Sequence, residues 1–140
     1  MKKLLTGGLI FVSLGGLLLL SLPTILHKAG LHPVYSGPMV SLPGKRALII
    51  TTSHDVLAEP GETEGEATGV MASELTHPYY TFLDGGMDVD LASIQGGEIP
   101  IDPQTLRFMV KSPEDERYLN DTLAQAKVNN AIPIAGVDIG

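Results

Sequence analysis

The 140-residue sequence contains no cysteine and no tryptophan, and it has few basic residues. Without cysteine, these residues hold no disulfide, no thiolate metal ligand and no cysteine nucleophile. Lys and Arg number 9 against 16 Asp and Glu, which gives a formal net charge of -7. Such a chain repels phosphate groups, and only 5% of its residues are aromatic, so we expect no nucleic-acid binding.

Charged residues are also absent from residues 4–26, LLTGGLIFVSLGGLLLLSLPTIL. A helix that rises about 1.5 Å per residue crosses a hydrocarbon core of about 30 Å within this length, which predicts a single transmembrane helix. Lys2 and Lys3 favour a cytoplasmic N-terminus and place the remainder on the outer face. The alternative is a cleaved signal peptide and a secreted protein, although residues 27–29, His-Lys-Ala, form a poor cleavage site.

The composition predicts three segments. Residues 1–27 form the membrane anchor or uncleaved signal, and residues 28–44, rich in proline and glycine, form a tether. Residues 45–140 then form an α/β domain.

Hydrophobic patterns predict a β-α-β unit within this domain. Residues 47–52, ALIITT, are typical of a strand buried on both faces in a parallel sheet. Residues 53–69 are rich in glutamate and glycine, and we expect a long solvated loop there. The apolar spacing of residues 70–83 predicts an amphipathic helix that ends at Gly85 and Gly86, and residues 87–93 alternate as a second strand.

The C-terminal part begins a second helix. Ser112 is a typical N-cap, followed by Pro113 and two acids, so we expect a helix from there to about Val128. Residues 131–139 resemble a connection toward a third strand that this chain does not supply. Since a pair of parallel strands leaves edges unpaired, we expect the N-terminal portion of a doubly wound, flavodoxin-like or Rossmann-like parallel sheet.

Three ionisable residues are candidates for a site. Glu74 stands beside apolar positions of the predicted helix, where a carboxylate is tolerated if it meets a polar pocket. His54 and Asp55 follow the first strand, where open α/β sheets bind ligands, and the same pair is also suited to a turn. The acids of residues 53–69 match no metal-binding spacing, so no metal site is predicted.

The sequence resembles the N-terminal half of a known superfamily. Three segments carry the resemblance: ALIITTSHD, TGVMASELTHPYYTF and GGMDVDLASIQGGEIPIDPQTL. They contain, in order and with the same spacing, the motifs TGxxxxE, HPYY, VDxASxxGG and a PIDP turn. These motifs, over about residues 45–121, are similar to those of the ThiJ/PfpI superfamily, which has the class I glutamine amidotransferase-like fold. Within this superfamily, the motifs resemble those of the heat-shock-protein-thirty-one-like branch, which includes cofactor-independent glyoxalases.

The resemblance implies a supporting catalytic acid at Glu74, which would face a nucleophilic cysteine on a later strand-to-helix turn. It implies a cysteine-dependent hydrolase or lyase of the glyoxalase or amidase type, acting on small carbonyl compounds without a cofactor. This chain lacks that cysteine, so we expect a fragment that is inactive alone. The alternative is a non-enzymatic chaperone-like or partner-binding module, and a homodimer is compatible with both.

Overall fold

The computed structural model describes residues 2–31 and 35–137, with the backbone only for residues 2–12. The chain divides into two compact units, Met1–Ser36 and Gly37–Gly140. Residues 1, 32–34 and 138–140, which belong to the predicted anchor, tether and domain, lie outside the described residues.

The first unit is built on one long helix, α1, Lys2–Lys28. The leucines of its second half, Leu14 and Leu17 to Leu20, are exposed within this unit. Among the helices whose side chains are described, none is both long and apolar enough to cross a bilayer. Residues 4–12 of the predicted membrane segment are outside that set.

The second unit contains a parallel sheet of three strands in the order β1-β4-β5. β1, Arg46–Thr51, pairs along its whole length with β4, Asp88–Ser93. The short β5, Ile132–Pro133, pairs with the end of β4. The predicted α/β class is therefore confirmed, and both longer strands lie within one residue of their expected positions.

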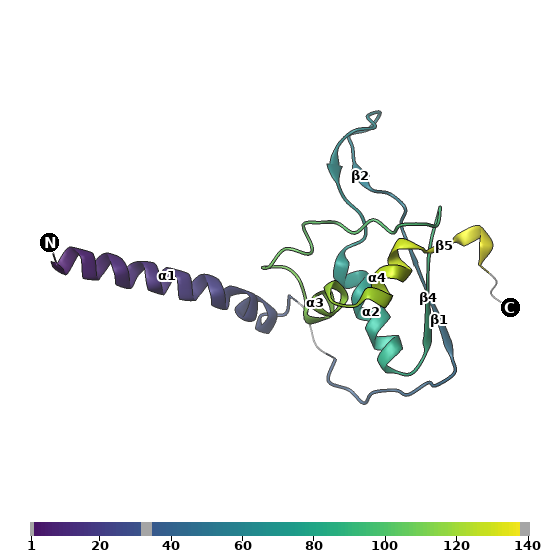
Figure 1. The fold of residues 1–140 in the computed structure, drawn as a ribbon, viewed down its shortest axis with the longest axis horizontal. Helices are drawn as coiled ribbons and strands as arrows, with labels where there is room; N and C mark the ends of the chain where they lie inside the picture. The colour runs from purple at the N-terminus through teal and green to yellow at the C-terminus, as the bar shows by residue number, and fades with distance from the viewer. Residues whose placement is uncertain (1, 32–34, 138–140) are drawn as a thin grey trace. The chain divides into compact units, whose positions relative to one another are not determined.

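Three helices cover one face of this sheet (Figure 1). α2, Ala72–Asp84, connects β1 to β4, while α3, Pro113–Leu119, and α4, Thr122–Asn129, connect β4 to β5. Their apolar side chains meet alternate strand residues in one core. Its buried members are Leu75, Tyr79, Tyr80, Val89, Leu91, Ile99, Ala124, Val128 and Ala131.

The predicted single helix from Pro113 to Val128 is wrong in one respect, because it is interrupted at Asn120 and Asp121. The Asp121 carboxylate accepts hydrogen bonds from the backbone N–H groups of Leu123 and Ala124, at 3.0 and 3.1 Å. It is thus the N-cap of a new helix, and the chain changes direction there. The predicted N-cap at Ser112 is confirmed as a full capping box with Asp115.

Two other expectations are corrected. The predicted loop of residues 53–69 contains a small hairpin of β2, Val56–Leu57, and β3, Glu66–Ala67. The third strand that the sequence did not predict is present as β5, whose connection continues into a 3-10 turn, Ile134–Gly136. β2, β3 and β5 are each only two residues long, too short to show a hydrophobic period in the sequence.

A buried hydrogen bond joins α2 to α3. The Thr76 hydroxyl donates to Oδ1 of Asp115 at 2.6 Å, and both residues are buried. The other oxygen, Oδ2, accepts from the backbone N–H of Ser112 at 2.7 Å in the capping box. Since a buried carboxylate needs its hydrogen bonds, Thr76 and Ser112 together satisfy Asp115.

We expect Thr76→Val to destabilise the second unit by about 1–3 kcal/mol, because the shape is kept while a buried carboxylate oxygen loses its donor. The measurement is the free energy of unfolding in urea. Thr81→Val is the matched control, because Thr81 lies on the same helix and is exposed. Equal effects of the two substitutions would show that the Thr76–Asp115 bond contributes nothing.

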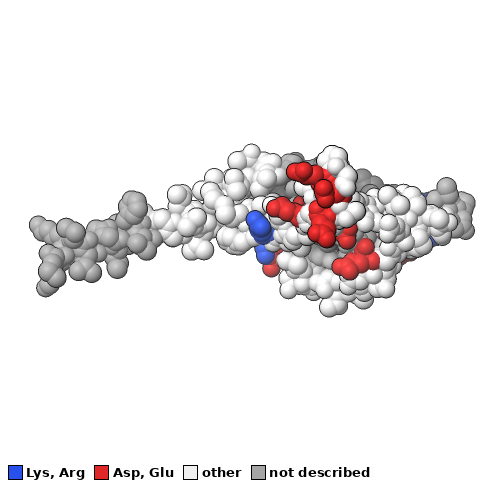
Figure 2. All heavy atoms as spheres, turned by 90° about the horizontal axis from the view of Figure 1, so that it is seen from above, with Lys and Arg blue, Asp and Glu red and all other residues white. Residues whose placement is uncertain are grey.

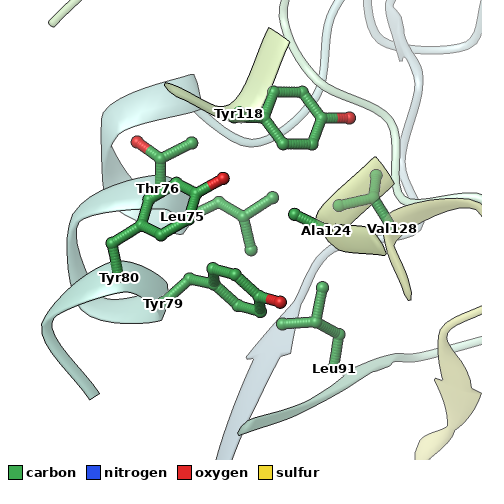
Figure 3. A pocket seen from close by; sticks show the side chains of 8 residues that line it. All are labelled: Leu75, Thr76, Tyr79, Tyr80, Leu91, Tyr118, Ala124 and Val128. Carbon is green, nitrogen blue, oxygen red and sulfur yellow. The ribbon is translucent and has the colours of Figure 1, made fainter. Parts of the chain in front are cut away.

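Tyrosine rings fill the space between α2 and the following helices (Figure 3). Tyr79 and Tyr80 meet edge to face with ring centroids 5.0 Å apart, and Arg117 lies over the Tyr80 ring at 4.0 Å. Arg117 also makes two hydrogen bonds to Asp84, at 2.8 and 2.9 Å. The remaining gap is about 10 Å³, which is no larger than one water, so this is a packed core and not a ligand site.

The Tyr80 hydroxyl donates to Asp121 at 3.2 Å. Burial, followed by the Asp121 charge, raises the pKa of Tyr80 above its ordinary value of 10.0. Burial is also the main cause that raises the pKa of Tyr79 and of Tyr118. The folded protein therefore keeps these phenols protonated at a pH where the unfolded chain ionises them.

The contribution of these protonated tyrosines to the free energy of unfolding should accordingly be fully present below pH 10.0. It should fall as the pH rises above that value, because ionisation of the phenols favours the unfolded chain. Each such tyrosine adds a slope of up to about 1.4 kcal/mol per pH unit. Unfolding free energies measured at pH 9 to 11 should fall less steeply in Tyr80→Phe than in the wild type. Tyr35→Phe is the control, because Tyr35 is exposed; a slope changed equally by both would contradict the assignment.

Candidate functional site

The carboxyl edge of the sheet gathers the candidate site residues. β1 and β4 run parallel and end at this edge, and α2 begins there because it returns antiparallel to both strands (Figure 1). Open parallel α/β sheets bind their ligands at this edge, beside the loops that follow the strands.

His54 and Asp55 follow β1 after two intervening residues, and both are exposed. The His54 N–H donates to the Thr52 hydroxyl at 2.9 Å, and the Asp55 carbonyl accepts from the Thr68 N–H at 2.8 Å. The backbone of the pair therefore forms the turn and closes the base of the β2–β3 hairpin. Their side chains remain accessible at the edge.

The loop after β4 is fixed to the loop after β1. Ser53 accepts a hydrogen bond from the Gln95 N–H at 2.9 Å, and Ser93 accepts one from the Gly96 N–H at 3.0 Å. Gly96 has a φ of +74°, and a Cβ at this position would lie 2.7 Å from the nitrogen of Pro133. Glycine is required by both the backbone conformation and the close approach of Pro133.

Glu74 lies on the first turn of α2, and its side chain is exposed. The start of this helix is held by the segment that contains the PIDP turn. The Thr105 hydroxyl accepts from the Ala72 N–H at 3.0 Å, and the Pro100 carbonyl accepts from the Val70 N–H at 2.9 Å. Gly69 permits this contact, because a Cβ there would lie 2.2 Å from the Pro100 oxygen. The position of Glu74 therefore depends on the turn at residues 100–105.

The three predicted site residues thus share one edge of the sheet. In the described part of the chain, no hydrogen bond or ion pair joins the Glu74 carboxylate to His54 or Asp55. Among the residues that the structure describes, no group of three or more His, Asp or Glu side chains is arranged to hold a metal ion. The edge offers two carboxylates, Glu74 and Asp55, and the imidazole of His54, and the 140 residues contain no thiol.

Sequence reasoning did not identify Ser53 and Thr105 as structural residues of this site. Both act through hydrogen bonds to backbone groups more than thirty residues away, at Gln95 and Ala72. The available signals were weak: a serine immediately after a strand, and a threonine in a proline-rich turn.

Acidic side chains gather on the face shown in Figure 2. The hairpin region between β1 and α2 supplies exposed acids, namely Asp55, Glu59, Glu62, Glu64 and Glu66. A surface of this sign disfavours anionic ligands and favours neutral or cationic ones.

A broad open hollow lies beside residues 98–106 and has a volume of about 500 Å³. Its lining mixes apolar side chains such as Ile101 and Leu119 with Glu98, Gln125 and Asn129. Gln125 already donates to the carbonyls of Tyr118 and Leu119, at 2.9 and 3.0 Å. The side chains that line it include no nucleophile of the kind expected from the sequence.

No family model matches the chain, and no curated protein matches it. Among solved structures, it is similar to Rapid Encystment Protein 24 kDa of Francisella tularensis, with 38% identity and a TM-score of 0.57. That match covers 68% of this chain and 40% of the other. The chain is also similar to the protein APC35852, with 33% identity, a TM-score of 0.46, and coverage of 63% and 34%. The match thus spans less than half the length of either solved protein, and neither name states a reaction or a ligand.

Proposed function

We propose that this chain is the N-terminal part of a ThiJ/PfpI-like protein with a doubly wound, flavodoxin-like sheet. In its intact form this protein would be a cysteine-dependent hydrolase or lyase of the glyoxalase or amidase type. The observation that carries the proposal is the position of Glu74 on the first turn of α2, at the carboxyl edge of a parallel sheet. The TGxxxxE and HPYY motifs support it, because they contain and follow this residue.

The chemistry proposed for the intact protein needs a thiolate close to Glu74. The sulfur would add to the carbonyl carbon of a small aldehyde or amide, forming a C–S bond as the C=O electron pair moves to oxygen. Glu74 would hydrogen-bond to the sulfur, influence its protonation and transfer a proton. The cysteine would come from polypeptide outside these 140 residues, since they contain none.

The exposure of Glu74 is compatible with this role. A carboxylate that meets a thiol from another part of the protein must be accessible when that part is absent. His54 and Asp55 are exposed at the same edge and would line the same pocket. The 140 residues alone are expected to have no turnover.

Glu74→Gln in the intact, cysteine-bearing protein should lower kcat by about 10²- to 10⁴-fold, because the amide cannot transfer a proton. Turnover of a small 2-oxoaldehyde is the measurement, with the unfolding midpoint expected to stay unchanged. Glu62→Gln is the control, because Glu62 is an exposed acid of the hairpin region. Unchanged kinetics in Glu74→Gln would remove the assigned role.

A second candidate is a non-enzymatic chaperone-like or partner-binding module. The observation that favours it is the set of exposed apolar side chains on the sheet, including Ile50 and Ile132. Suppression of the aggregation of unrelated unfolded proteins by this chain would separate this function from an enzymatic one.

We also propose that residues 4–26 anchor the protein in a bilayer, with the second unit on the outer face. The uncharged run and the uninterrupted helix α1, Lys2–Lys28, support this proposal. The helix length of about 40 Å at 1.5 Å per residue is sufficient. In the alternative, residues 4–26 belong to a signal peptide that is cleaved from a secreted protein. The N-terminus of the mature chain would then lie after residue 26.

Replacement of both Leu17 and Leu18 by Arg should release the full chain from membranes, since each buried Arg costs about 2.5–3.5 kcal/mol at the bilayer centre. The measurement is the fraction that stays with membranes after extraction with alkaline carbonate. Leu57→Arg is the control, because Leu57 is similarly exposed on the hairpin. A wild-type chain found entirely in the soluble fraction would contradict the anchor.

A further inference from the structure

The chain enters the second unit along the edge of the sheet where β1 and β4 begin, which we call the amino edge (Figure 1). The Leu42 N–H donates to the carbonyl of Gly85, in the turn between α2 and β4, at 2.7 Å. A Cβ on Gly86 would lie 3.5 Å from Cα of Pro43, so Pro43 packs against the same turn. The last residues of the predicted tether are therefore held in place before β1 begins.

The amino edge exposes apolar side chains from two segments. Met39, Val40 and Leu42 precede β1, and Leu83 lies on the last turn of α2; their exposed fractions are between 38% and 70%. The Leu42–Gly85 hydrogen bond joins the two segments. We call these four residues the amino-edge patch. Exposed apolar residues gathered in this way are typical of a surface that contacts another molecule.

Charge divides between the two edges of the sheet. The hairpin region and the first turn of α2, at the carboxyl edge, carry acids and no Lys or Arg, since no basic residue occurs between Arg46 and Arg107. Ion pairs at the amino edge join Arg46 to Asp90 at 2.9 Å and Arg117 to Asp84 at 2.8 Å. Basic and acidic side chains are nearly balanced there, namely Lys45, Arg46, Arg117 and Lys127 with Asp84, Asp88 and Asp90.

The patch also follows the uncharged run of residues 4–26 closely in the chain. Residues 27–38 span at most about 45 Å when fully extended, at about 3.5 Å per residue. A linker this short gives an effective local concentration of the order of mM. Contacts that are too weak to bind a free protein are then sufficient to hold an anchored one.

We propose that the amino-edge patch lies in the interface of an anionic lipid bilayer, with Lys45 beside the lipid phosphates. This proposal rests on the anchor proposed for residues 4–26 and adds an orientation to it. The candidate site at the carboxyl edge then faces the aqueous phase. Its ligand is accordingly a water-soluble molecule and not a lipid.

Screening decides between this orientation and the opposite one. β1 spans about 20 Å from edge to edge, at about 3.3 Å per residue. The Debye length is about 8 Å at physiological salt, so the acids of the carboxyl edge lie beyond the reach of the lipid phosphates when the amino edge is down. The opposite orientation brings those acids against the phosphates. At the amino edge, each Lys or Arg near the surface contributes about 1 kcal/mol, and the apolar side chains add buried area.

The test uses fluorescence quenching by lipid on the full chain, reconstituted in vesicles of three parts phosphatidylcholine to one part phosphatidylglycerol. Because the sequence contains no cysteine, Leu83→Cys gives a single site for an environment-sensitive fluorophore. Lipids with a nitroxide on the head group should at least halve its emission. Leu57→Cys, on the hairpin, is the matched control and should keep its emission. Leu83 is distant from the anchor in sequence, so its quenching reports on the folded edge and not on the tether.

A second set of variants tests the patch itself. Val40→Glu combined with Leu42→Glu should restore most of the emission at residue 83, because it places two charges in the interface. Leu57→Glu is the control and should leave the quenching at residue 83 unchanged. Circular dichroism and the unfolding midpoint of each variant separate lost lipid contact from lost folding.

Sedimentation with the vesicles, measured on the same samples, separates this proposal from the anchor. A chain that stays in the supernatant would overturn both. A chain that sediments with the two labels equally quenched, or with neither quenched, would overturn the orientation alone. Equal quenching at residue 83 in vesicles of phosphatidylcholine alone would overturn the assignment of an anionic surface. Blue-shifted emission at residue 83 without quenching would overturn the proposal in favour of a second copy or another polypeptide on this edge.

Discussion

The parallel pairing of β1 with β4 is the constraint on which the rest of the second unit depends. Parallel neighbours cannot be joined by a tight turn, so the chain must return along the sheet before β4 begins, and α2 is that return. The apolar side of α2 then packs on Ile49 and Leu91 through Leu75 and Tyr79. This geometry places the start of α2, and with it Glu74, at the carboxyl edge of the sheet.

A network of polar contacts fixes the later helices against α2. Asp115 accepts hydrogen bonds from the Thr76 hydroxyl of α2 and from the Ser112 N–H at the start of α3. Asp121 accepts one from the Tyr80 hydroxyl of α2 and is the N-cap of α4. Each carboxylate therefore acts in secondary structure and in tertiary packing at once. Arg117 contributes by spanning Tyr80 and Asp84. The helical layer is in this way specified by directional bonds as well as by apolar burial.

Features encoded by local patterns could be predicted from the sequence, and features that depend on distant contacts could not. An apolar run predicts β1, the alternation of apolar and polar residues predicts β4, and the helical spacing of apolar residues predicts α2. The N-cap at Ser112 is predicted by the proline and acids that follow it. β5 could not be found, because its two residues become a strand only by pairing with β4. The break at Asp121 was missed because the same residues fit a continuous helix. At the site, the sequence indicated Glu74, His54 and Asp55, but not that Ser53 and Thr105 hold the surrounding loops.

The anchoring of α2 has a consequence for variation among related proteins. The hairpin region leaves the sheet at Asp55 and returns at Thr68, where a hydrogen bond of 2.8 Å closes its base. The helix that follows takes its starting point from Pro100 and Thr105, on a different loop. Insertions and deletions between β2 and β3 can therefore accumulate while the acid stays in place, since extra loop length adds little entropic cost. The hairpin can therefore change in length and sequence without disturbing the position of Glu74.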